Sequence, residues 1–255
     1  MLKELLEIWE FPLSTNYKLN NNNNKMRKVS RRQKNIRKKI ENNIYSSLEE
    51  AIKILRETST AKFVETVELH ANLNIDPKYA DQQLRTTVTL PNGIGKTTRI
   101  AVLTNETNFD EATNNGADIV GNDNLIQDIS EGNLDFDLLI STPEMMPKLA
   151  KLGRILGPKG LMPSPKSGTV TNNLSSTLYD FKKGKFEYKA DKTGIVHVSF
   201  GKANFSETKL LENLICIYKS IEQNRPPGVK GKYFKSIHIC SSMGPSIKLN
   251  LDAFE

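Results

Sequence analysis

The segment whose residue types and spacing come closest to a known chemistry is 93–98 (GIGKTT), which is similar to the end of a nucleotide-binding P-loop. That motif needs a glycine five positions before the glycine that precedes its lysine, but Leu90 occupies this place. A helix must also follow, whereas residues 99–103 (RIAVL) predict a strand. A nucleotide-hydrolysing site is therefore disfavoured, and an enzyme that uses Lys96 and Thr97 is kept as a rival hypothesis.

Thiols and imidazoles are few and widely spaced. Cys216 and Cys240 fit no metal-ligand spacing, and their apolar neighbours predict buried thiols in a reduced compartment. His70, His197 and His238 are too far apart in the sequence to predict a cluster, so structural or surface roles are expected. We therefore expect no catalytic residue, no metal site and no cofactor.

Residues 152–171 (LGRILGPKGLMPSPKSGTVT, the Gly/Pro loop) contain four glycines and three prolines, so we expect neither a helix nor a central strand through them. The segment is too apolar for a solvated linker, which predicts an ordered loop. Its charged residues are Arg154, Lys159 and Lys166, without a carboxylate, histidine or cysteine. Such a loop can present cations and backbone N–H groups to an anion. A connection between domains with incidental lysines explains the composition equally well.

The charges of the chain are unevenly distributed, although they sum to only +7 from 36 basic and 29 acidic residues. Residues 25–39 hold nine Lys or Arg and no acid, and residues 225–248 hold five and no acid. Residues 104–144 hold ten Asp or Glu and no Lys or Arg. The simplest arrangement joins the two basic ends and inserts an acidic lobe between them. A polyanion would bind the basic lobe and be repelled by the acidic one.

Length and composition fit a folded protein without a membrane-spanning segment. The 255 residues, 37% of them hydrophobic and 25% charged, can form one large domain or two of ordinary size. No apolar run approaches the length that spans a bilayer. Residues 1–29 include an asparagine run at 20–24 and are expected to be a variable, disordered extension. Glu4, Glu7 and Glu10 argue against a transit peptide within it.

Both ends of the chain predict helices and strands in alternation. Ser46 or Ser47 is a suitable N-cap for one helix. Ser206 begins a longer helix with an apolar stripe, which stops before residues 225–228 (RPPG). The segments expected as strands are 63–69, 83–90, 185–189, 195–200 and 233–240. The turn at 191–194 predicts that the third and fourth of these pair as a hairpin.

The middle of the chain repeats a strand followed by a helix, which predicts a small parallel sheet covered by helices. The turn after its first strand, 105–108, has no glycine fingerprint and carries an acid where a pyrophosphate would lie, so a dinucleotide site is not expected. The expected strands are 99–104, 119–120 and 136–141. The expected helices are 109–115, 124–130, 143–149 and 175–181.

Four motifs occur in one order along the chain: TAKFVE at 60–65, the Gly/Pro loop, DKTGIVH at 191–197 and SMGP at 242–245. Together they resemble the ribosomal protein L-one family, whose members form the mobile stalk beside the tRNA exit site of the large ribosomal subunit. The similarity covers roughly residues 30–252 without large gaps. Stretches such as FEYKADKTGIVHVSFGKANFS are most similar to the cyanobacterial and plastid branch.

The resemblance implies an α/β fold of two domains, in which a split α+β domain built from both chain ends carries an inserted Rossmann-like α/β domain. It places the first at 30–92 and 184–255, the second at 93–183, and the extension at 1–29. The Gly/Pro loop would face the cleft. The implied hinge residues are Pro91, Asn92, Gly93, Lys183 and Gly184. The implied loop residues are Arg154, Gly157, Pro158, Lys159, Gly160, Met162, Pro163, Pro165 and Lys166.

The resemblance also implies an rRNA site on the split domain. Its residues are Lys62, Phe63, Glu65, Thr66, Asp191, Lys192, Gly194, His197, Ser242, Met243 and Gly244. Lysines can neutralise phosphates, whereas hydroxyls and carboxylates can bond the ribose 2′-OH groups that distinguish RNA from DNA. Glycines let the backbone approach a sugar, and Phe63 and Met243 offer apolar surface. Two alternatives stay open: Phe63 as a core residue, and Asp191 as a turn residue.

The function implied by the resemblance is structural rather than enzymatic. The chain is expected to bind large-subunit rRNA, to form the mobile stalk and to assist release of deacylated tRNA from the exit site. Bacterial members also repress translation of their own messenger, so the chain's own mRNA is a further expected partner. No membrane and no small-molecule substrate are expected. The expected location is the plastid stroma, with a bacterial cytoplasm as the alternative, and general polyanion binding is the remaining rival function.

Overall fold

The computed structural model describes residues 30–40, 45 and 47–254, so the extension expected at 1–29 lies outside the described residues. The helices are α1 (Arg31–Ile40), α2 (Leu48–Thr58), α3 (Phe109–Asn114), α4 (Asp123–Glu131), α5 (Met146–Ala150), α6 (Gly153–Lys159), α7 (Leu174–Lys183) and α8 (Glu207–Gln223). The strands are β1 (Thr66–Leu73), β2 (Arg85–Thr89), β3 (Ile100–Leu103), β4 (Ile119–Gly121), β5 (Leu138–Ser141), β6 (Lys185–Lys189), β7 (Ile195–Lys202), β8 (Phe234–Ser241) and β9 (Ile247–Leu249). None of the helices in this described part has the length and apolarity needed to cross a bilayer. The mixed α/β class expected from the sequence is confirmed.

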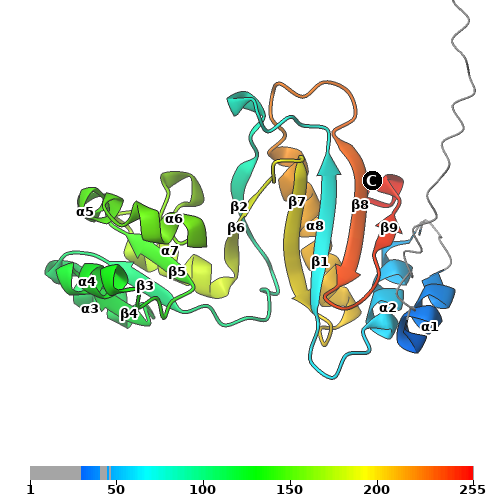
Figure 1. The fold of residues 1–255 in the computed structure, drawn as a ribbon, viewed down its shortest axis with the longest axis horizontal. Helices are drawn as coiled ribbons and strands as arrows, with labels where there is room; N and C mark the ends of the chain where they lie inside the picture. The colour runs from blue at the N-terminus through cyan, green and yellow to red at the C-terminus, as the bar shows by residue number, and fades with distance from the viewer. Residues whose placement is uncertain (1–29, 41–44, 46, 255) are drawn as a thin grey trace, which may run out of the picture.

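One antiparallel sheet unites the two ends of the chain, with the strand order β7-β1-β8-β9. Strand β1 comes from the N-terminal part and lies between β7 and β8 from the C-terminal part, as Figure 1 shows. Along β1 every second side chain is buried, beginning with Val67 and ending with Leu73. This alternation is typical of a sheet with one packed face and one open face.

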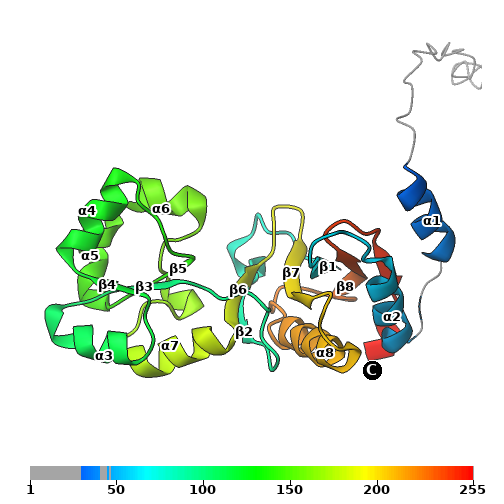
Figure 2. The same cartoon turned by 90° about the horizontal axis from the view of Figure 1, so that it is seen from below.

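Helices α2 and α8 pack against the inner face of this sheet, and Figure 2 shows α8 lying below it. Helix α8 begins where the sequence predicts, because the Ser206 hydroxyl accepts the N–H of Lys209 (3.4 Å). Its apolar stripe is buried in one cluster with Leu55 of α2 and Phe200 of β7. We refer to these four strands with α1, α2 and α8 as the antiparallel body.

The second sheet is parallel, with the order β4-β3-β5. All four residues of β3 are buried, because helices cover both faces. Ile100 and Val102 pack with α3 and α7, whereas Ala101 and Leu103 pack with α4, α5 and α6. The small parallel sheet expected from the sequence is thus confirmed. We refer to these strands and helices as the parallel body.

A two-stranded ribbon of β2 and β6 lies between the two bodies in Figure 1. At the base of the ribbon, the segment that leaves the antiparallel body at Gly93 touches the segment that returns to it at Gly184. A Cβ on Gly184 (φ +116°) would lie 2.8 Å from the Cα of Gly93, so only glycine fits. The buried Asn213 of α8 fixes this point. Its amide oxygen accepts the N–H of Asn92 (3.2 Å), and its amide nitrogen donates to the carbonyls of Gly93 (3.0 Å) and Phe200 (2.8 Å).

Two strand predictions differ from the structure. The strand expected at 63–69 begins only at Thr66, because the chain bends through residues 61–63. The alternative that Phe63 is a core residue is wrong as well, since this side chain is 57% exposed. The expected hairpin does not form, because β6 pairs with β2 and β7 pairs with β1. Its turn is present, closed by the bond from the Asp191 N–H to the Ile195 carbonyl (2.9 Å), and one isolated antiparallel bridge joins Ala190 to Val196.

The expectation that no helix runs through the Gly/Pro loop is also wrong, because α6 occupies its first part. Pro158 lies in the last turn of the helix, where it removes a single backbone donor. The helix ends at Lys159, and Gly160 (φ +72°) is its C-cap. Each glycine within the helix costs about 1 kcal/mol relative to alanine. Burial of Leu156 against Leu149 of α5 offsets this cost.

Candidate nucleic-acid interface

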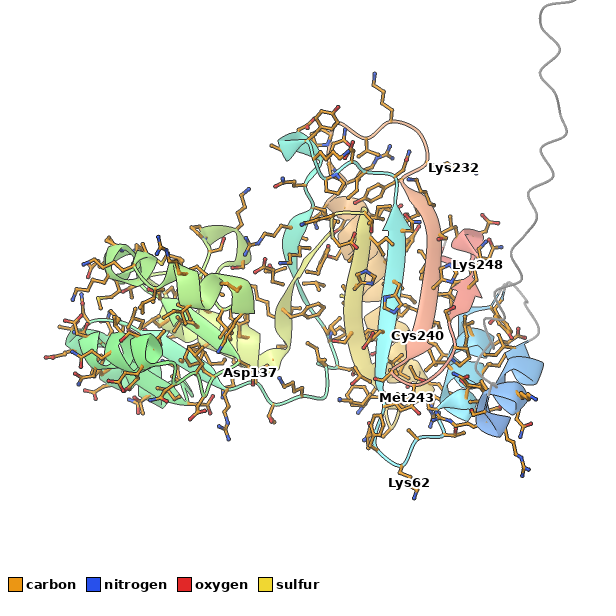
Figure 3. The ribbon with its side chains drawn as sticks, in the orientation of Figure 1. Lys62, Asp137, Lys232, Cys240, Met243 and Lys248 are labelled. Carbon is orange, nitrogen blue, oxygen red and sulfur yellow. The ribbon has the colours of Figure 1, made fainter. Side chains whose placement is uncertain are left out.

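Seven of the residues assigned to RNA contact gather at one end of the antiparallel sheet, where Figure 3 labels Lys62 and Met243. These residues are Lys62, Phe63, Glu65, Thr66, Ser242, Met243 and Gly244. They meet because β1 and β8 are antiparallel, which sets Val67 opposite Ser241. Phe63 is 57% exposed and Met243 is 55% exposed, so two large apolar side chains lie on the surface beside an exposed lysine.

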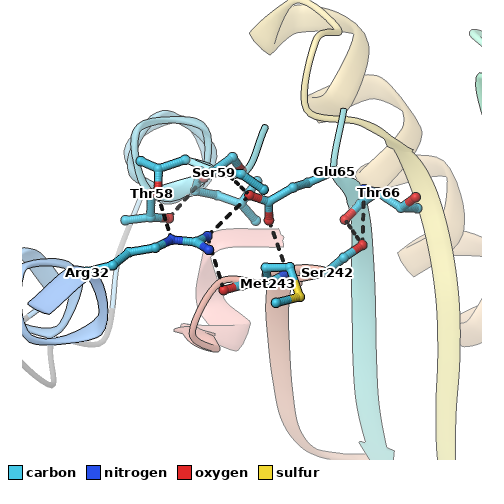
Figure 4. A network of polar contacts seen from close by, with 10 residues as sticks. Arg32, Thr58, Ser59, Glu65, Thr66, Ser242 and Met243 are labelled. Atoms are coloured by element: carbon cyan, nitrogen blue, oxygen red, sulfur yellow. Dashed lines mark hydrogen bonds and ion pairs between the residues drawn. The ribbon is translucent and has the colours of Figure 1, made fainter. Parts of the chain in front are cut away.

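A buried carboxylate holds this end of the sheet together (Figure 4). Glu65 is 1% exposed and accepts the N–H groups of Ala61 (2.9 Å) and Met243 (3.1 Å). Arg32 of α1 lies 3.5 Å from it and also donates to Thr60 Oγ1 (2.8 Å) and the Met243 carbonyl (3.4 Å). Burial raises the pKa of Glu65, but the neighbouring Ser241 hydroxyl, the N–H groups of Ala61 and Met243 and the charge of Arg32 outweigh burial and hold that pKa below its usual value.

The role predicted for Glu65 therefore needs correction. A carboxylate this deeply buried, with both oxygens engaged inside the protein, does not present itself to a ribose hydroxyl. It instead positions the backbone of Met243. Arg32 was not singled out from the sequence, because its place in a basic run gives no sign that one arginine of the run reaches a buried partner.

Thr66 and Ser242 join the two loops. The Ser242 hydroxyl accepts the N–H of Thr66 (3.1 Å) and donates to its carbonyl (3.3 Å). Lys202 at the end of β7 donates to Thr66 Oγ1 (2.7 Å). The Thr66 hydroxyl keeps its own proton and one lone pair, and the Ser242 hydroxyl keeps one lone pair, so each can bind at least one further partner. Lys202 is a further cation at this site that sequence reasoning missed.

Three other assigned residues lie in the turn before β7. The Asp191 carboxylate accepts the N–H groups of Ile195 (2.8 Å) and Thr193 (2.9 Å), and the first of these bonds is the main reason that its pKa is lowered. Gly194 has φ +80°, and a Cβ there would lie 3.0 Å from the carbonyl of Ile75. Asp191 and Gly194 thus build the turn, as the alternative for Asp191 expected, while Lys192 points an exposed cation outward.

The two groups of assigned residues lie at opposite ends of the sheet. Thr66 is opposite Lys202, whereas Asn72 is opposite Ile195, next to the turn. Six residues along β1 correspond to about 20 Å. The assigned residues therefore do not form one compact patch but mark the two ends of a face, with His197 between them.

The side chains between these ends define the open face of the sheet. They are Glu68, His70, Asn72, His197, Ser199, Ser236, His238, Cys240 and Lys248, all exposed or half-buried. Contrary to the sequence expectation, two histidines touch: the Nδ1 atoms of His70 and His197 are 2.7 Å apart. Nε2 of His70 lies 3.1 Å from Sγ of Cys240, a thiol that is half-buried rather than fully buried. Burial, and then the charge of His197, lowers the pKa of His70.

The acidic and basic segments of the sequence also lie in different parts of the structure. The acidic stretch at 104–144 forms β4, β5 and α3 to α4 of the parallel body. Three of its acids pair with lysines of the same body, at 2.8 Å for Asp118 and 2.7 Å for both Asp123 and Asp137. The basic α1 and the basic strands β8 and β9 belong to the antiparallel body.

The Gly/Pro loop faces the β2–β6 ribbon across a cleft of about 590 Å³. Arg85, paired with Glu187, and Lys189 line the ribbon side. The implied loop residues that line the other side are Gly157, Gly160, Met162 and Pro163. The remaining ones are exposed on the surface: Arg154, Pro158, Lys159, Pro165 and Lys166.

The P-loop-like segment has no phosphate-binding geometry. Strand β3 follows it, as expected, so no helix N-terminus points at Lys96. The amine of Lys96 instead lies 2.7 Å from Asp137, and this bond is the main cause of the lowered pKa of that carboxylate. The geometry speaks against the rival hypothesis of a nucleotide-dependent enzyme.

A protein-family model described as "Ribosomal protein L1p/L10e family" matches residues 55–245. The chain belongs to this family. The large ribosomal subunit protein uL1c of Trieres chinensis is 73% identical over 229 residues, which are 90% of this chain and 100% of that protein. The uL1c protein of Phaeodactylum tricornutum is 72% identical over 229 residues with the same shares. The uL1 protein of Prochlorococcus marinus (strain MIT 9215) is 54% identical over 230 residues, 90% of this chain and 97% of that protein.

Membership of the L1p/L10e family confirms the resemblance that the four motifs indicate, including its plastid and cyanobacterial branch. The chain is a structural protein of the large ribosomal subunit and not an enzyme. Its similarity to the uL1c proteins agrees with the expected plastid location on the ribosome.

Proposed function

We propose that the antiparallel body binds large-subunit rRNA directly, along the open face of its sheet. The observation that carries this proposal is the pair of exposed apolar side chains, Phe63 and Met243, on loops braced by the buried Glu65. A soluble protein gains nothing in stability from such surface groups. Unstacked bases and ribose rings, however, pack well on aromatic and apolar side chains.

The polar groups around this pair suit RNA. Lys62 and Lys202 can neutralise phosphates at this end of the face, and Lys192 can do so about 20 Å away at the other end. The hydroxyls of Thr66 and Ser242 each have at least one free position for a ribose 2′-OH. Shape, phosphates and sugars are the features by which proteins recognise folded RNA.

We further propose the domain division 30–92 with 184–255, and 93–183. Each has its own core: one apolar cluster draws on residues 36–94 and 186–254, and two others draw on 100–181. Gly93 and Gly184 touch where the chain crosses between them, so a swing of the inserted domain needs backbone rotation at only these two passages. Movement of this domain, with its cation-bearing Gly/Pro loop, would support a mobile stalk and the release of deacylated tRNA.

A second proposed function is repression of the chain's own messenger. The surface described above offers apolar contact, cations and hydroxyls rather than a pattern that reads base edges. Any transcript that folds like the rRNA site would therefore bind in the same place. Purified protein should bind its own leader transcript more tightly than a scrambled sequence of equal length, and equal affinity would end this idea.

The main proposal is tested by titrating the protein with a folded fragment of its rRNA and with duplex DNA at moderate salt. We expect a clear preference for RNA, whereas equal binding would favour a general polyanion binder. A shortened chain, with residues 93–183 replaced by a short glycine linker, tests the assignment to the antiparallel body. The contact between Gly93 and Gly184 allows such a linker. Retained affinity is expected, and its loss in a folded protein would place the site elsewhere.

A further inference from the structure

Three potential metal ligands converge on the open face of the antiparallel sheet. Within the described residues, a carboxylate oxygen of Glu68, Nε2 of His70 and Sγ of Cys240 all lie within 4.8 Å of one another. Nε2 of His70 is 3.7 Å from the carboxylate and 3.1 Å from the thiol. The three side chains are half-buried, so an ion can reach them from solvent while the sheet fixes their positions.

The two separations at Nε2 of His70 are close to those of a tetrahedral zinc site. Bond lengths of about 2.0–2.3 Å to oxygen, nitrogen and sulfur imply ligand atoms roughly 3.3–3.6 Å apart. The contact of His70 with Cys240 needs to lengthen by a few tenths of an ångström, and the carboxylate of Glu68, which is 39% exposed, has room to turn. Strand register supplies the arrangement, because Glu68 stands directly opposite Cys240 and His70 is two residues along the same strand.

A second layer of contacts orients the imidazole. Nδ1 of His70 lies 2.7 Å from Nδ1 of His197, and Nε2 of His197 lies 3.7 Å from the Asp191 carboxylate. If Nδ1 of His70 carries the proton and donates it to His197, then Nε2 of His70 has its lone pair directed at the ligand cluster. A metal-binding histidine usually has its other ring nitrogen held in this way.

We infer that Glu68, His70 and Cys240 form a binding site for a divalent transition-metal ion of the Zn²⁺ class, with the fourth position open to solvent. One thiolate, one imidazole and one carboxylate favour such an ion over Mg²⁺ or Ca²⁺, which prefer oxygen ligands alone. In the metal-free protein the Cys240 thiol can donate its proton to Nε2 of His70. The ion replaces this proton, forms one bond each to sulfur, nitrogen and oxygen, and releases the proton to water.

The test uses the full-length metal-free protein, a phosphine reductant that keeps both thiols reduced, and Co²⁺ as a coloured substitute for Zn²⁺. We expect a thiolate-to-cobalt charge-transfer absorption that saturates at one ion per chain and disappears when Zn²⁺ is added. Cys240→Ser should remove this absorption, while Glu68→Gln and His70→Gln should weaken binding. His197→Leu, which removes only the orienting contact, should keep the absorption but weaken affinity about 10–100-fold.

The other cysteine provides the matched control. Cys216 is also half-buried and free, but it contacts the backbone of Thr89 and not the cluster. Cys216→Ser should therefore leave the absorption unchanged. The inference is overturned if the wild-type protein shows no saturable absorption, if the absorption survives Cys240→Ser, or if Cys216→Ser abolishes it. Circular dichroism checks that each variant is folded. If Cys240→Ser does not fold, His70→Gln, whose side chain lies on the open face of the sheet, is used in its place.

Discussion

The two sheets of the molecule use their faces differently. The antiparallel sheet packs one face on α2 and α8 and leaves polar and charged side chains on the other. The parallel sheet has helices on both faces, and all four residues of its central strand β3 are buried. Of these two bodies, the antiparallel one can therefore offer the surface of a sheet to a ligand, whereas the described part of the parallel one offers helix surfaces and loops.

The bodies also differ in how their exposed loops are held. The loops around Phe63 and Met243 are fixed by a buried carboxylate that bonds backbone groups of both. The Gly/Pro loop of the parallel body packs through Leu156 in its first half, and hydrogen bonds of uncharged groups join Thr169 to Ser141 and Ser164 in its second half, while its cations face solvent. A loop fixed by directed hydrogen bonds keeps its geometry to a fraction of an ångström, which suits recognition.

The largest expected effect separates the stabilities of the two bodies. Ile140→Ala in the parallel sheet and Ile239→Ala in the antiparallel sheet each delete a fully buried side chain and should each cost about 2–5 kcal/mol of unfolding free energy. In a urea titration of Ile140→Ala, the parallel body should unfold at a lower urea concentration than the one at which RNA binding is lost. In Ile239→Ala, RNA binding should be lost at lower urea than in the wild type. Simultaneous loss of both signals in Ile140→Ala would contradict the division.

Removal of the buried carboxylate should have the next largest effect. Glu65→Ala leaves the N–H groups of Ala61 and Met243 without their partner and should cost about 1–3 kcal/mol of unfolding free energy. RNA affinity should fall with it, because the Met243 loop loses its support. Glu65→Gln keeps one acceptor and should lose less. A stable Glu65→Ala variant with unchanged affinity would remove the bracing role.

The lowered pKa of Glu65 also predicts that the stability of the fold depends on pH. Because the pKa of Glu65 is lower in the folded protein than its ordinary value of 4.5, the ionised group stabilises the fold fully above that value. This contribution is lost as the pH falls through the lowered folded pKa. Urea unfolding in steps of pH from neutral to acidic should show a decline that is smaller in Glu65→Gln. Parallel declines in both proteins would show that other carboxylates account for the effect.

Substitutions on the recognition surface should act more on RNA binding than on stability, although Ser242→Val also removes two hydrogen bonds to the backbone of Thr66. Met243→Asp and Ser242→Val should each weaken rRNA binding by about 1–3 kcal/mol, as expected for an unpaired buried charge or a lost polar contact. Tyr179, which is 65% exposed on the parallel body, provides the matched control. Tyr179→Asp should bind as the wild type does in a filter or fluorescence titration. Equal losses in all three variants would indicate a nonspecific effect of the surface.

The smallest expected effect concerns one phosphate contact. Lys62→Ala should weaken RNA binding to a similar extent for all bound sequences and reduce the slope of log K against log salt by about 0.7–0.9. The exposed Lys151 of the parallel body is the control, and its alanine variant should keep the wild-type slope. An unchanged slope in Lys62→Ala would remove this lysine from the contact surface.

Local patterns predicted much of this architecture. Helix α8 begins after Ser206 and buries its stripe, and the strand–helix repeat of the parallel body is present with small shifts at the ends of elements. Capping, helical periodicity and runs of apolar residues act between neighbours in the sequence, so they can be recognised without a fold. The four motifs indicated the family for the same reason, since each is contiguous.

Predictions that depended on distant partners were less successful. The hairpin expected between 185–189 and 195–200 was wrong because β1 and β2, more than 90 residues earlier, provide the pairing edges. The RNA contact predicted for Glu65 was corrected because the burial of this side chain depends on Arg32 and on Met243, which follows Glu65 by 178 residues. No periodicity within a single segment carries such information.

Without a structure it was possible to predict the family, the mixed α/β class and the separation of basic ends from an acidic middle, since composition and contiguous motifs are properties of the chain alone. Tertiary structure decided which strands pair, that Glu65 is buried, and that His70 meets both His197 and Cys240. Strand pairing selects partners across the whole chain, and burial depends on what those partners cover. These contacts exist only after the ends of the chain have joined in one sheet.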